Sequence, residues 1–451
     1  MTIDKRLWQI CGWALAAMLF GLAIHTPATI WMGTMLPDGL DVIIKAWKEV
    51  LMVAVALVVT VLVVRDGDLR RRLASDRLFW LMKGYAWLHI IMLAVYWQGW
   101  WPSVAGLMID LRYLLAFMLV YVVVAAYPPM RRYLLGAIAV GAVIIIGFAT
   151  VQHALPHDAL KAIGYGPDTV VPYLTVDQNY DYIRLSSTMR GPNPMGAYAA
   201  SVVLVVLALA WAGRLRDRLM QLGAGLLTVL AAIALWFSYS RSAKLALLAG
   251  LVVLAIVLQP WRRIPKQWLV SAGVFVAVAM LAAGVALSQT AFFSNVVLHT
   301  NPEGGSTTQS NDEHLSSLID GSERMLAQPF GAGVGSTGSA SLFGDQPLII
   351  ENQYLFIAHE VGWLGLGLFV AITVMVLWRL YRLVANDPWA AGVLASGVGL
   401  VAVGLVLPVW VDDVVSIVWW SLAAVVLAGG GSAAKANKRY TKKHAGKRTS
   451  D

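Results

Sequence analysis

Long apolar runs recur along the whole chain and constrain its fold more than any other feature. Runs of about twenty residues are long enough to cross a hydrocarbon core about 30 Å thick. Charged residues make up only 13% of the sequence, about half the fraction of a soluble domain. The runs fall at residues 7–24, 46–64, 78–97, 105–127, 133–151, 195–212, 219–237, 245–258, 268–287, 354–378, 390–409 and 414–427. We therefore predict an all-α polytopic membrane protein with about twelve transmembrane helices.

Basic residues are unevenly distributed between the two sides of these runs. With a cytoplasmic N-terminus, the two tails and the even-numbered connections contain 24 of the 34 lysines and arginines. The positive-inside rule then places both termini in the cytoplasm. The net charge of +9 lies mainly in these connections. It indicates topology and attraction to anionic lipids rather than nucleic-acid binding.

Two long polar segments, at 152–190 and 289–352, then lie outside the cytoplasm. The second is too long for a simple connector and is typical of a functional cap. The single cysteine, Cys11, excludes an intrachain disulfide. We predict the following parts: transmembrane helices 1–9 within 1–288, with the external loop 152–190; a large external loop or cap at 289–353; helices 10–12 within 354–430; and a basic cytoplasmic tail at 431–451.

Ten basic residues lie outside the cytoplasmic connections or within spans, where a charge usually pairs, reaches the interface or serves a site. We expect Lys48 to pair with Glu49 or to reach the interface, and Lys83 to reach the interface. Arg112 lies two positions after Asp110, and residues so spaced on a helix do not face each other. A local ion pair is therefore a poor explanation of Arg112.

A short polar turn at 238–244, Ser-Tyr-Ser-Arg-Ser-Ala-Lys, separates two apolar runs. Arg241 lies where the second run begins as a helix with free backbone N–H groups. A guanidinium, hydroxyls such as that of Ser240, and a helix N-terminus together suit an anion, best of all a phosphate. A cation that reaches lipid phosphates at the outer leaflet explains Arg241 equally well.

A second cationic turn precedes the sixth span. Arg184 and Arg190 lead into Gly191-Pro192-Asn193-Pro194, and proline suits the first turn of a helix. Two helix starts, each with arginine on the outer side, indicate one shared anionic ligand.

A third stretch contains Arg324 and the glycines Gly331, Gly333 and Gly335. These glycines resemble a phosphate-binding loop, but no strand precedes them and no Gly-Lys-Ser/Thr follows, which favours a flexible lid. Glu351 and Asn352 lie where the external segment returns to the membrane. Glu351 is a candidate general base, although an interfacial residue or a helix cap fits its position as well.

Together, these stretches resemble the O-antigen ligase and Wzy-type polymerase superfamily of bacterial cell-surface glycan assembly. The likeness covers about 112–370 and comprises an Arg and Pro-Asn helix start, a Ser-Arg pair, an Arg before Pro and Gly-x-Gly, and a final Tyr-Leu, Glu and Gly-x-x-Gly. The matching residues are Arg184, Arg190, Asn193, Ser240, Arg241, Arg324, Pro329, Gly331, Gly333, Asn352, Tyr354, Leu355, Glu360, Gly362 and Gly365. Ligases of the family usually have His before the Asn; here that residue is Glu351, and His359 follows eight positions later. This departure favours a polymerase-like member.

The resemblance implies a GT-C-like, metal-independent, inverting glycosyltransferase without a cofactor, in the bacterial inner membrane with its site facing the periplasm. Its substrates would be a glycan carried on undecaprenyl diphosphate and an acceptor glycan or glycolipid. Its other partners would be membrane lipids and, for a polymerase, a chain-length regulator, but no nucleic acid. The implied diphosphate-binding residues are Arg184, Arg190, Arg241 and Arg324; Glu351 and Arg241 would be catalytic; and Asn193, Ser240, Asn352, Tyr354 and Arg112 would support them.

Two other functions stay open. An O-antigen ligase would transfer the glycan to lipid A-core or another acceptor. A flippase or transporter of lipid-linked glycans belongs to a different class, and it would place its charges near the midplane of the membrane. The outer positions of the arginines favour the enzyme.

Overall fold

The computed structural model describes residues 3–37, 44–156, 158–176, 179–262 and 307–445, together with scattered positions between 263 and 306. Within these ranges the chain is mostly helical, and ten helical segments are long and apolar enough to cross a membrane. The prediction of an all-α polytopic membrane protein is therefore confirmed. The strands found in these ranges form one two-stranded hairpin.

The elements follow the chain in this order. The first part contains α1 (Ile3–Gly21), η1 (Leu22–Ile24), α2 (His25–Gly33), α4 (Trp47–Arg65), α5 (Gly67–Ala74), α6 (Arg77–Val95), α7 (Trp100–Ala126), α8 (Met130–Ala154) and η2 (Ala159–Ile163). The hairpin and its flanking helices are β1 (Leu174–Val176), β2 (Asn179–Arg184), α9 (Pro192–Trp211), α10 (Arg218–Phe237), α11 (Arg241–Leu258) and η3 (Pro260–Arg262). The last part contains α13 (Thr307–Ala327), α14 (Gly338–Ser341), α15 (Gln353–Leu383), α16 (Pro388–Val403), η5 (Val409–Val411) and α17 (Asp413–Ala445).

Ten of the twelve predicted spans coincide with the membrane-crossing helices. The ninth, at 268–287, lies outside the described residues. The eleventh, predicted to reach 409, ends earlier, because α16 stops at Val403. Backbone groups beyond it bond to the start of α15: the Gln353 N–H donates to the Gly404 carbonyl (2.9 Å), and the Asn352 amide donates to the Leu405 carbonyl (2.7 Å).

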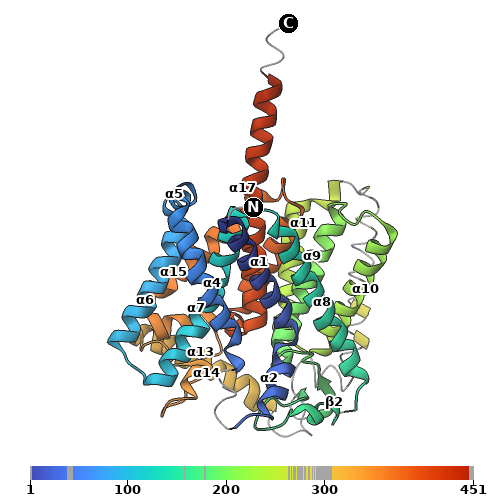
Figure 1. Ribbon diagram of the computed structural model, residues 1–451. Helices are drawn as coiled ribbons and strands as arrows, with labels where there is room; N and C mark the ends of the chain where they lie inside the picture. Colours follow the sequence, from blue (N-terminus) through green and yellow to red (C-terminus); the bar gives the residue numbers. More distant parts are fainter. Residues whose placement is uncertain are drawn as a thin grey trace.

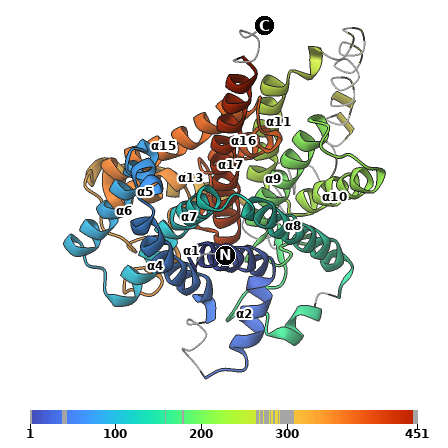
Figure 2. The same ribbon diagram turned by 45° about the horizontal axis from the view of Figure 1, so that its top comes forward.

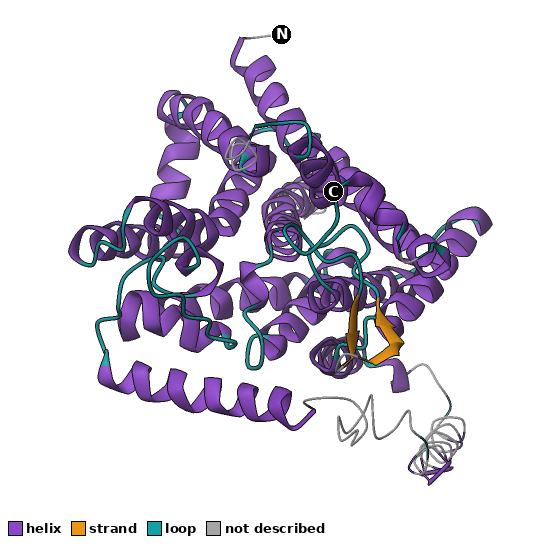
Figure 3. Ribbon diagram, turned by 90° about the horizontal axis from the view of Figure 1, so that it is seen from below, coloured by secondary structure: helices purple, strands orange, loops and turns teal. Residues whose placement is uncertain are grey.

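The helices run between two ends of the molecule (Figure 1). The N-terminus, α5 and the C-terminal part of α17 lie at one end, which we call the basic end. The hairpin, α13 and α14 lie at the opposite end, which we call the loop end. Figure 3 looks at the loop end, where the hairpin lies among several connecting loops.

The first 18 residues of α17 form the centre of the bundle. Within 413–430, 94% of the residues are buried, and Figure 2 shows α17 surrounded by the other helices. It packs most extensively against α7. An aromatic cluster fills this contact, with the Tyr113 ring 5.4 Å from that of Trp420 and the Trp419 and Trp420 rings 5.3 Å apart. The central helix is therefore held by large apolar side chains.

Three helices pack almost backbone to backbone on one side of α17. A Cβ atom at Gly392 of α16 would lie 2.7 Å from the Cα atom of Val205 in α9. A Cβ atom at Gly399 of α16 would lie 2.6 Å from the carbonyl oxygen of Ala246 in α11. Small residues permit such close packing of membrane helices. Helices α9, α11 and α16 therefore form one tightly packed unit.

Candidate active site

Arg184, the last residue of β2, joins the two cationic turns. Its Nε donates to the Ser238 carbonyl (2.9 Å), and a terminal nitrogen donates to Asn193 Oδ1 (2.6 Å). The next N–H, of Leu185, donates to the carbonyl of Phe237 (3.0 Å). The start of α9 and the turn between α10 and α11 therefore lie in direct contact at the loop end.

The turn before α11 is sharp and closely packed. Tyr239 has φ of 48°, a left-handed conformation that is uncommon for a bulky residue. Ser240 caps α11, its hydroxyl accepting from the Ala243 N–H (3.3 Å). At the facing position of α9, a Cβ on Gly196 would lie 2.6 Å from Ser238 Oγ. A glycine in α9 thus lets the two helix starts approach each other.

Helix α8 holds the backbone of the segment from Arg184 to Arg190 through hydrogen bonds. The side-chain oxygen of Gln152 accepts from the N–H groups of Ser186 (3.2 Å) and Ser187 (2.7 Å). Ser187 has φ of 53° and, like Tyr239, is one of three non-glycine residues with positive φ among those described. Strained backbone of this kind gathers at functional sites. Both arginine-bearing turns contain one such residue.

Arg190 and Arg241 lie exposed at the starts of α9 and α11. Arg241 is the first residue of α11, and Arg190 directly precedes Gly191, the N-cap of α9. The positive charge of Arg190 acts on an acidic pair, Asp412 and Asp413, at the start of α17. The side chains expected to bind an anion are thus accessible at two helix N-termini.

A buried ionic cluster lies behind Arg190. Lys48 of α4 is only 2% exposed, and its Nζ lies 3.0 Å from Asp413 Oδ2 and 3.4 Å from Glu49 Oε2. His25 Nε2 is 3.1 Å from the same Asp413 oxygen, while its Nδ1 accepts from the Trp47 indole. The expected pairing of Lys48 with Glu49 is present. The alternative, that Lys48 reaches the interface, is wrong because buried carboxylates hold it.

Arg112 of α7 belongs to the same cluster. It donates to the carbonyl of Val411, and its other terminal nitrogen lies 3.6 Å from Glu49 Oε1. Arg112 is therefore explained by partners on α4 and η5, and it supports the backbone just before the acidic pair.

Asp412 and Asp413 escaped the sequence-based analysis, although two adjacent acids before an apolar run were visible. Asp412 Oδ1 accepts from the Val415 N–H at 2.9 Å and so caps α17. Burial raises the pKa of Asp412 to about 6, and the Asp413 carboxylate acts in the same direction. The positive charges of Arg112 and Arg190 oppose this shift. Asp412, Asp413 and the Arg190 cation thus interact electrostatically near the start of α17.

Glu351 is half-buried immediately before α15. Its backbone N–H donates to Ser317 Oγ of α13 (3.4 Å). Two residues on, Gln353 Oε1 accepts from the Trp410 N–H (2.8 Å), which connects this helix start to the segment before Asp412. Glu351 therefore lies at the junction of α13 and α15.

The supporting residues Asn352 and Tyr354 have structural contacts. The Asn352 carbonyl oxygen accepts from the N–H groups of Tyr354 (2.9 Å) and Leu355 (3.0 Å), so Asn352 is the N-cap of α15. The Tyr354 hydroxyl donates to the Val401 carbonyl (2.9 Å). The helix-cap role that the sequence allowed for Glu351 is thus filled by its neighbour, Asn352.

The N–H groups of the glycine segment, whose sequence resembled a phosphate-binding loop but favoured a lid, donate to α15 instead. The N–H groups of Gly335 and Thr337 donate to the Glu360 carboxyl, and those of Ala332 and Gly333 donate to carbonyls of α15. These donors are already used by the protein itself. Arg324 lies nearby, exposed in the last turn of α13.

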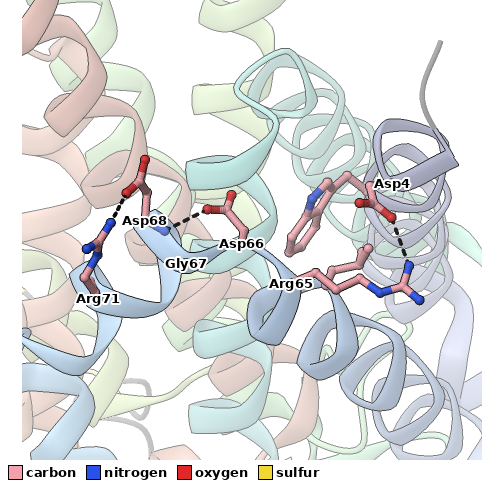
Figure 4. A pocket seen from close by; sticks show the side chains of 8 residues that line it. Asp4, Arg65, Asp66, Gly67, Asp68 and Arg71 are labelled. Carbon is pink, nitrogen blue, oxygen red and sulfur yellow. Dashed lines mark hydrogen bonds and ion pairs between the residues drawn. The ribbon is translucent and has the colours of Figure 1, made fainter.

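A depression of about 490 Å³ lies at the basic end, away from these arginines (Figure 4). Its charged side chains are paired near the surface, Arg65 with Asp4 (3.2 Å) and Arg71 with Asp68 (2.7 Å). Asp66 caps α5 beside them. Since these groups stabilise helix ends and each other, we assign this depression no role in catalysis.

The fold defines a multi-pass membrane protein that exposes Arg190 and Arg241 beside two helix starts at its loop end. Residues 226–370 match the family model described as O-antigen ligase. This match confirms the resemblance to the O-antigen ligase and Wzy-type polymerase superfamily and supports a glycosyltransferase-like activity of that type. It includes Arg241, Arg324 and Glu351, whereas Arg184 and Arg190 precede it. No curated protein matches the chain.

Proposed function

We propose that this chain is a membrane glycosyltransferase that joins glycans carried on a polyprenyl diphosphate, as a Wzy-like polymerase. The observation that carries the proposal is the contact of the two arginine-bearing helix starts through Arg184. The loop end would face the periplasm of a bacterial inner membrane, with the basic end in the cytoplasm.

The arginines would act on the leaving group. The acceptor hydroxyl oxygen attacks the anomeric carbon, the bond from that carbon to the diphosphate oxygen breaks, and the diphosphate leaves with the electron pair. Arg184, Arg190 and Arg241 would stabilise the charge that develops there, with Arg324 as a fourth cation. Guanidinium groups can supply this charge without a metal ion. One displacement inverts the anomeric centre.

Glu351 would take the proton of the acceptor hydroxyl or orient that hydroxyl for attack. The contact of its backbone with Ser317 of α13 supports an acceptor-binding role for this junction. The Asp412–Asp413 pair would hold Arg190 in place.

A ligase is the second candidate, favoured by the description of the matched family. The two reactions share the donor and differ in the acceptor. A polymerase extends a lipid-linked glycan by many repeats, whereas a ligase transfers one glycan to lipid A-core or another acceptor. The size distribution of the products distinguishes the two functions, because a polymerase gives a series of chain lengths and a ligase a single addition.

Substitution of Arg241 tests the proposal in proteoliposomes supplied with lipid-linked glycan. Arg241→Lys should reduce product strongly, because an ammonium cannot form the two parallel bonds of a guanidinium. Lys161→Ala is the matched control, since Lys161 is an exposed cation of η2 that pairs with Asp158. Full assembly by both Arg241→Lys and Arg241→Ala would make Arg241 a lipid contact.

A further inference from the structure

Helix α15 is interrupted at the place where the glycine loop, residues 328–337, bonds to its backbone. Val361 has φ of −124° and Gly362 φ of 69°, so both leave the helical conformation. The break frees backbone carbonyls within a buried segment, where unpaired polar groups are costly. The Ala332 N–H donates to the His359 carbonyl (2.6 Å) and the Gly333 N–H to the Glu360 carbonyl (3.1 Å). The glycine loop thus completes the interrupted helix.

The Glu360 side chain holds the other half of the loop. It is 1% exposed, and its Oε1 accepts from the Gly335 N–H at 2.9 Å and the Thr337 N–H at 3.4 Å. The loop also lies against α7, because a Cβ on Gly106 would lie 2.6 Å from the Cα of Gly335. Glu360 therefore clips a loop that fits only without side chains at these points.

The surroundings of Glu360 show that it serves as an acceptor. Its charged neighbour is another acid, Asp110 of α7, which itself lies 3.6 Å from His89 Nε2. A carboxylate beside a second carboxylate gains nothing from its charge. An amide would keep the acceptor oxygen for the two N–H groups and could donate to Asp110. Glutamine should therefore replace Glu360 in this role.

The clipped loop is the direct continuation of the helix turn that carries Arg324. The Gln328 N–H donates to the Arg324 carbonyl (2.8 Å), and the Trp363 indole donates to the Met325 carbonyl (2.8 Å). The Trp363 N–H also donates to the Pro329 carbonyl (2.9 Å). The end of α13 is thus fixed at the break in α15, on which Glu360 holds the loop.

We propose that Glu360 is a positioning residue: its carboxyl clips the glycine loop onto α15 and so sets the place of Arg324 at the loop end. The attachment of the loop by Glu360 does not depend on any substrate. Its effect on turnover rests on the proposed function, in which Arg324 binds the leaving diphosphate.

Hydrogen exchange of the full-length protein in lipid nanodiscs tests the clip without any substrate. Glu360→Met should accelerate exchange of the amides in 331–337 about tenfold, because two buried bonds are lost. Glu360→Asp, a milder change, should accelerate it as well, since the shorter side chain no longer reaches. Glu360→Gln should exchange like the wild type. Thr373→Val, a buried near-isosteric change on α15, is the matched control. Unchanged exchange in both Glu360→Met and Glu360→Asp, or fast exchange in Glu360→Gln, overturns the clip.

Kinetics in the same nanodiscs test the link to Arg324. Glu360→Asp should lower kcat/KM for the lipid-linked donor about tenfold, and Glu360→Gln should keep the wild-type value. In an Arg324→Ala background, Glu360→Asp should have no further effect. An equal decrease of kcat/KM in both backgrounds would show that Glu360 acts elsewhere. A wild-type protein without glycosyl transfer would reject the proposed function, while the exchange result would still judge the clip.

Discussion

At the scale of single residues, Glu351 is the position on which the proposed chemistry depends most. Glu351→Gln keeps the shape and removes the proton acceptor, so we expect product to fall about a hundredfold or more. Glu351→Asp should retain partial activity, and lipid-linked donor should accumulate. Product formation by purified protein measures both. A well-expressed Glu351→Gln protein that transfers glycan at the normal rate would remove Glu351 from the mechanism.

Lys48 allows a second test at this scale. Lys48→Met removes the buried cation that Glu49 and Asp413 share and leaves them only Arg112 and His25 as partners, which should cost about 3–5 kcal/mol. Thermal unfolding in nanodiscs should show a lowered midpoint, and a second change, Asp413→Asn, should recover part of the loss. Lys83→Met is the control, because Lys83 is exposed beside Trp80. Equal midpoints for the wild type and Lys48→Met would mean that the cluster adds little to stability.

Residue types were readable from the sequence, but their partners were not. The arginines near 184–190 and at 241 were recognised because their charge is exceptional in an apolar chain. Arg112 remained unexplained, since its acceptor at Val411 is 299 positions away. Asp413 was missed for the same reason, because only packing brings α17 to α4.

At the scale of elements, a cross-connection between α6 and α15 makes stability depend on pH. Asp76 Oδ2 and Oδ1 accept from the two terminal nitrogens of Arg379 at 2.8 and 2.5 Å. Burial would raise the pKa of Asp76, but the bonds from Arg379 and from the Leu78 N–H outweigh it and lower the pKa. A lowered folded-state pKa means that this stabilisation is complete above the unfolded value, about 3.9, and is lost as pH falls through the folded value.

Asp76→Asn isolates this contribution. We expect the wild type to exceed Asp76→Asn by about 1 kcal/mol at pH 7, since the pair is partly exposed. The difference should disappear as pH falls well below 4. Unfolding midpoints of both proteins, measured across this range, provide the check. A difference that persists at the lowest pH would point to packing rather than charge.

Helix starts were more predictable than helix breaks and C-terminal ends. The Pro-Asn start of α9 was predicted from residue chemistry, and so was a helix start at Arg241. The break at Gly362 and the early end of α16 were not, because apolar composition continues through both. Each depends on backbone donors or acceptors supplied by a distant segment, such as Ala332 for the broken α15.

At the scale of the whole molecule, the distribution of basic residues predicts the orientation in the membrane. Reporter fusions at Ser306 and Lys438 should report opposite sides of the membrane, with Lys438 in the cytoplasm. Both reporters on one side would contradict the topology. The fold class and ten of the twelve predicted spans were predictable from apolar length. The central place of α17 was not, because hydropathy does not distinguish lipid-facing from protein-facing helices.

The backbone contacts of α16 with α9 and α11 limit how this protein can diversify. Arg190 and Arg241 begin two helices that are locked together through Gly392 and Gly399. A shift of either helix would bring backbone atoms together at these glycines, so we expect the spacing of the two helix starts to be fixed. Relatives that handle different sugars would keep this frame and vary α13 and the loops around it. The diphosphate, which all donors share, would contact the α9, α11 and α16 unit, and the variable sugars would contact α13 and its loops.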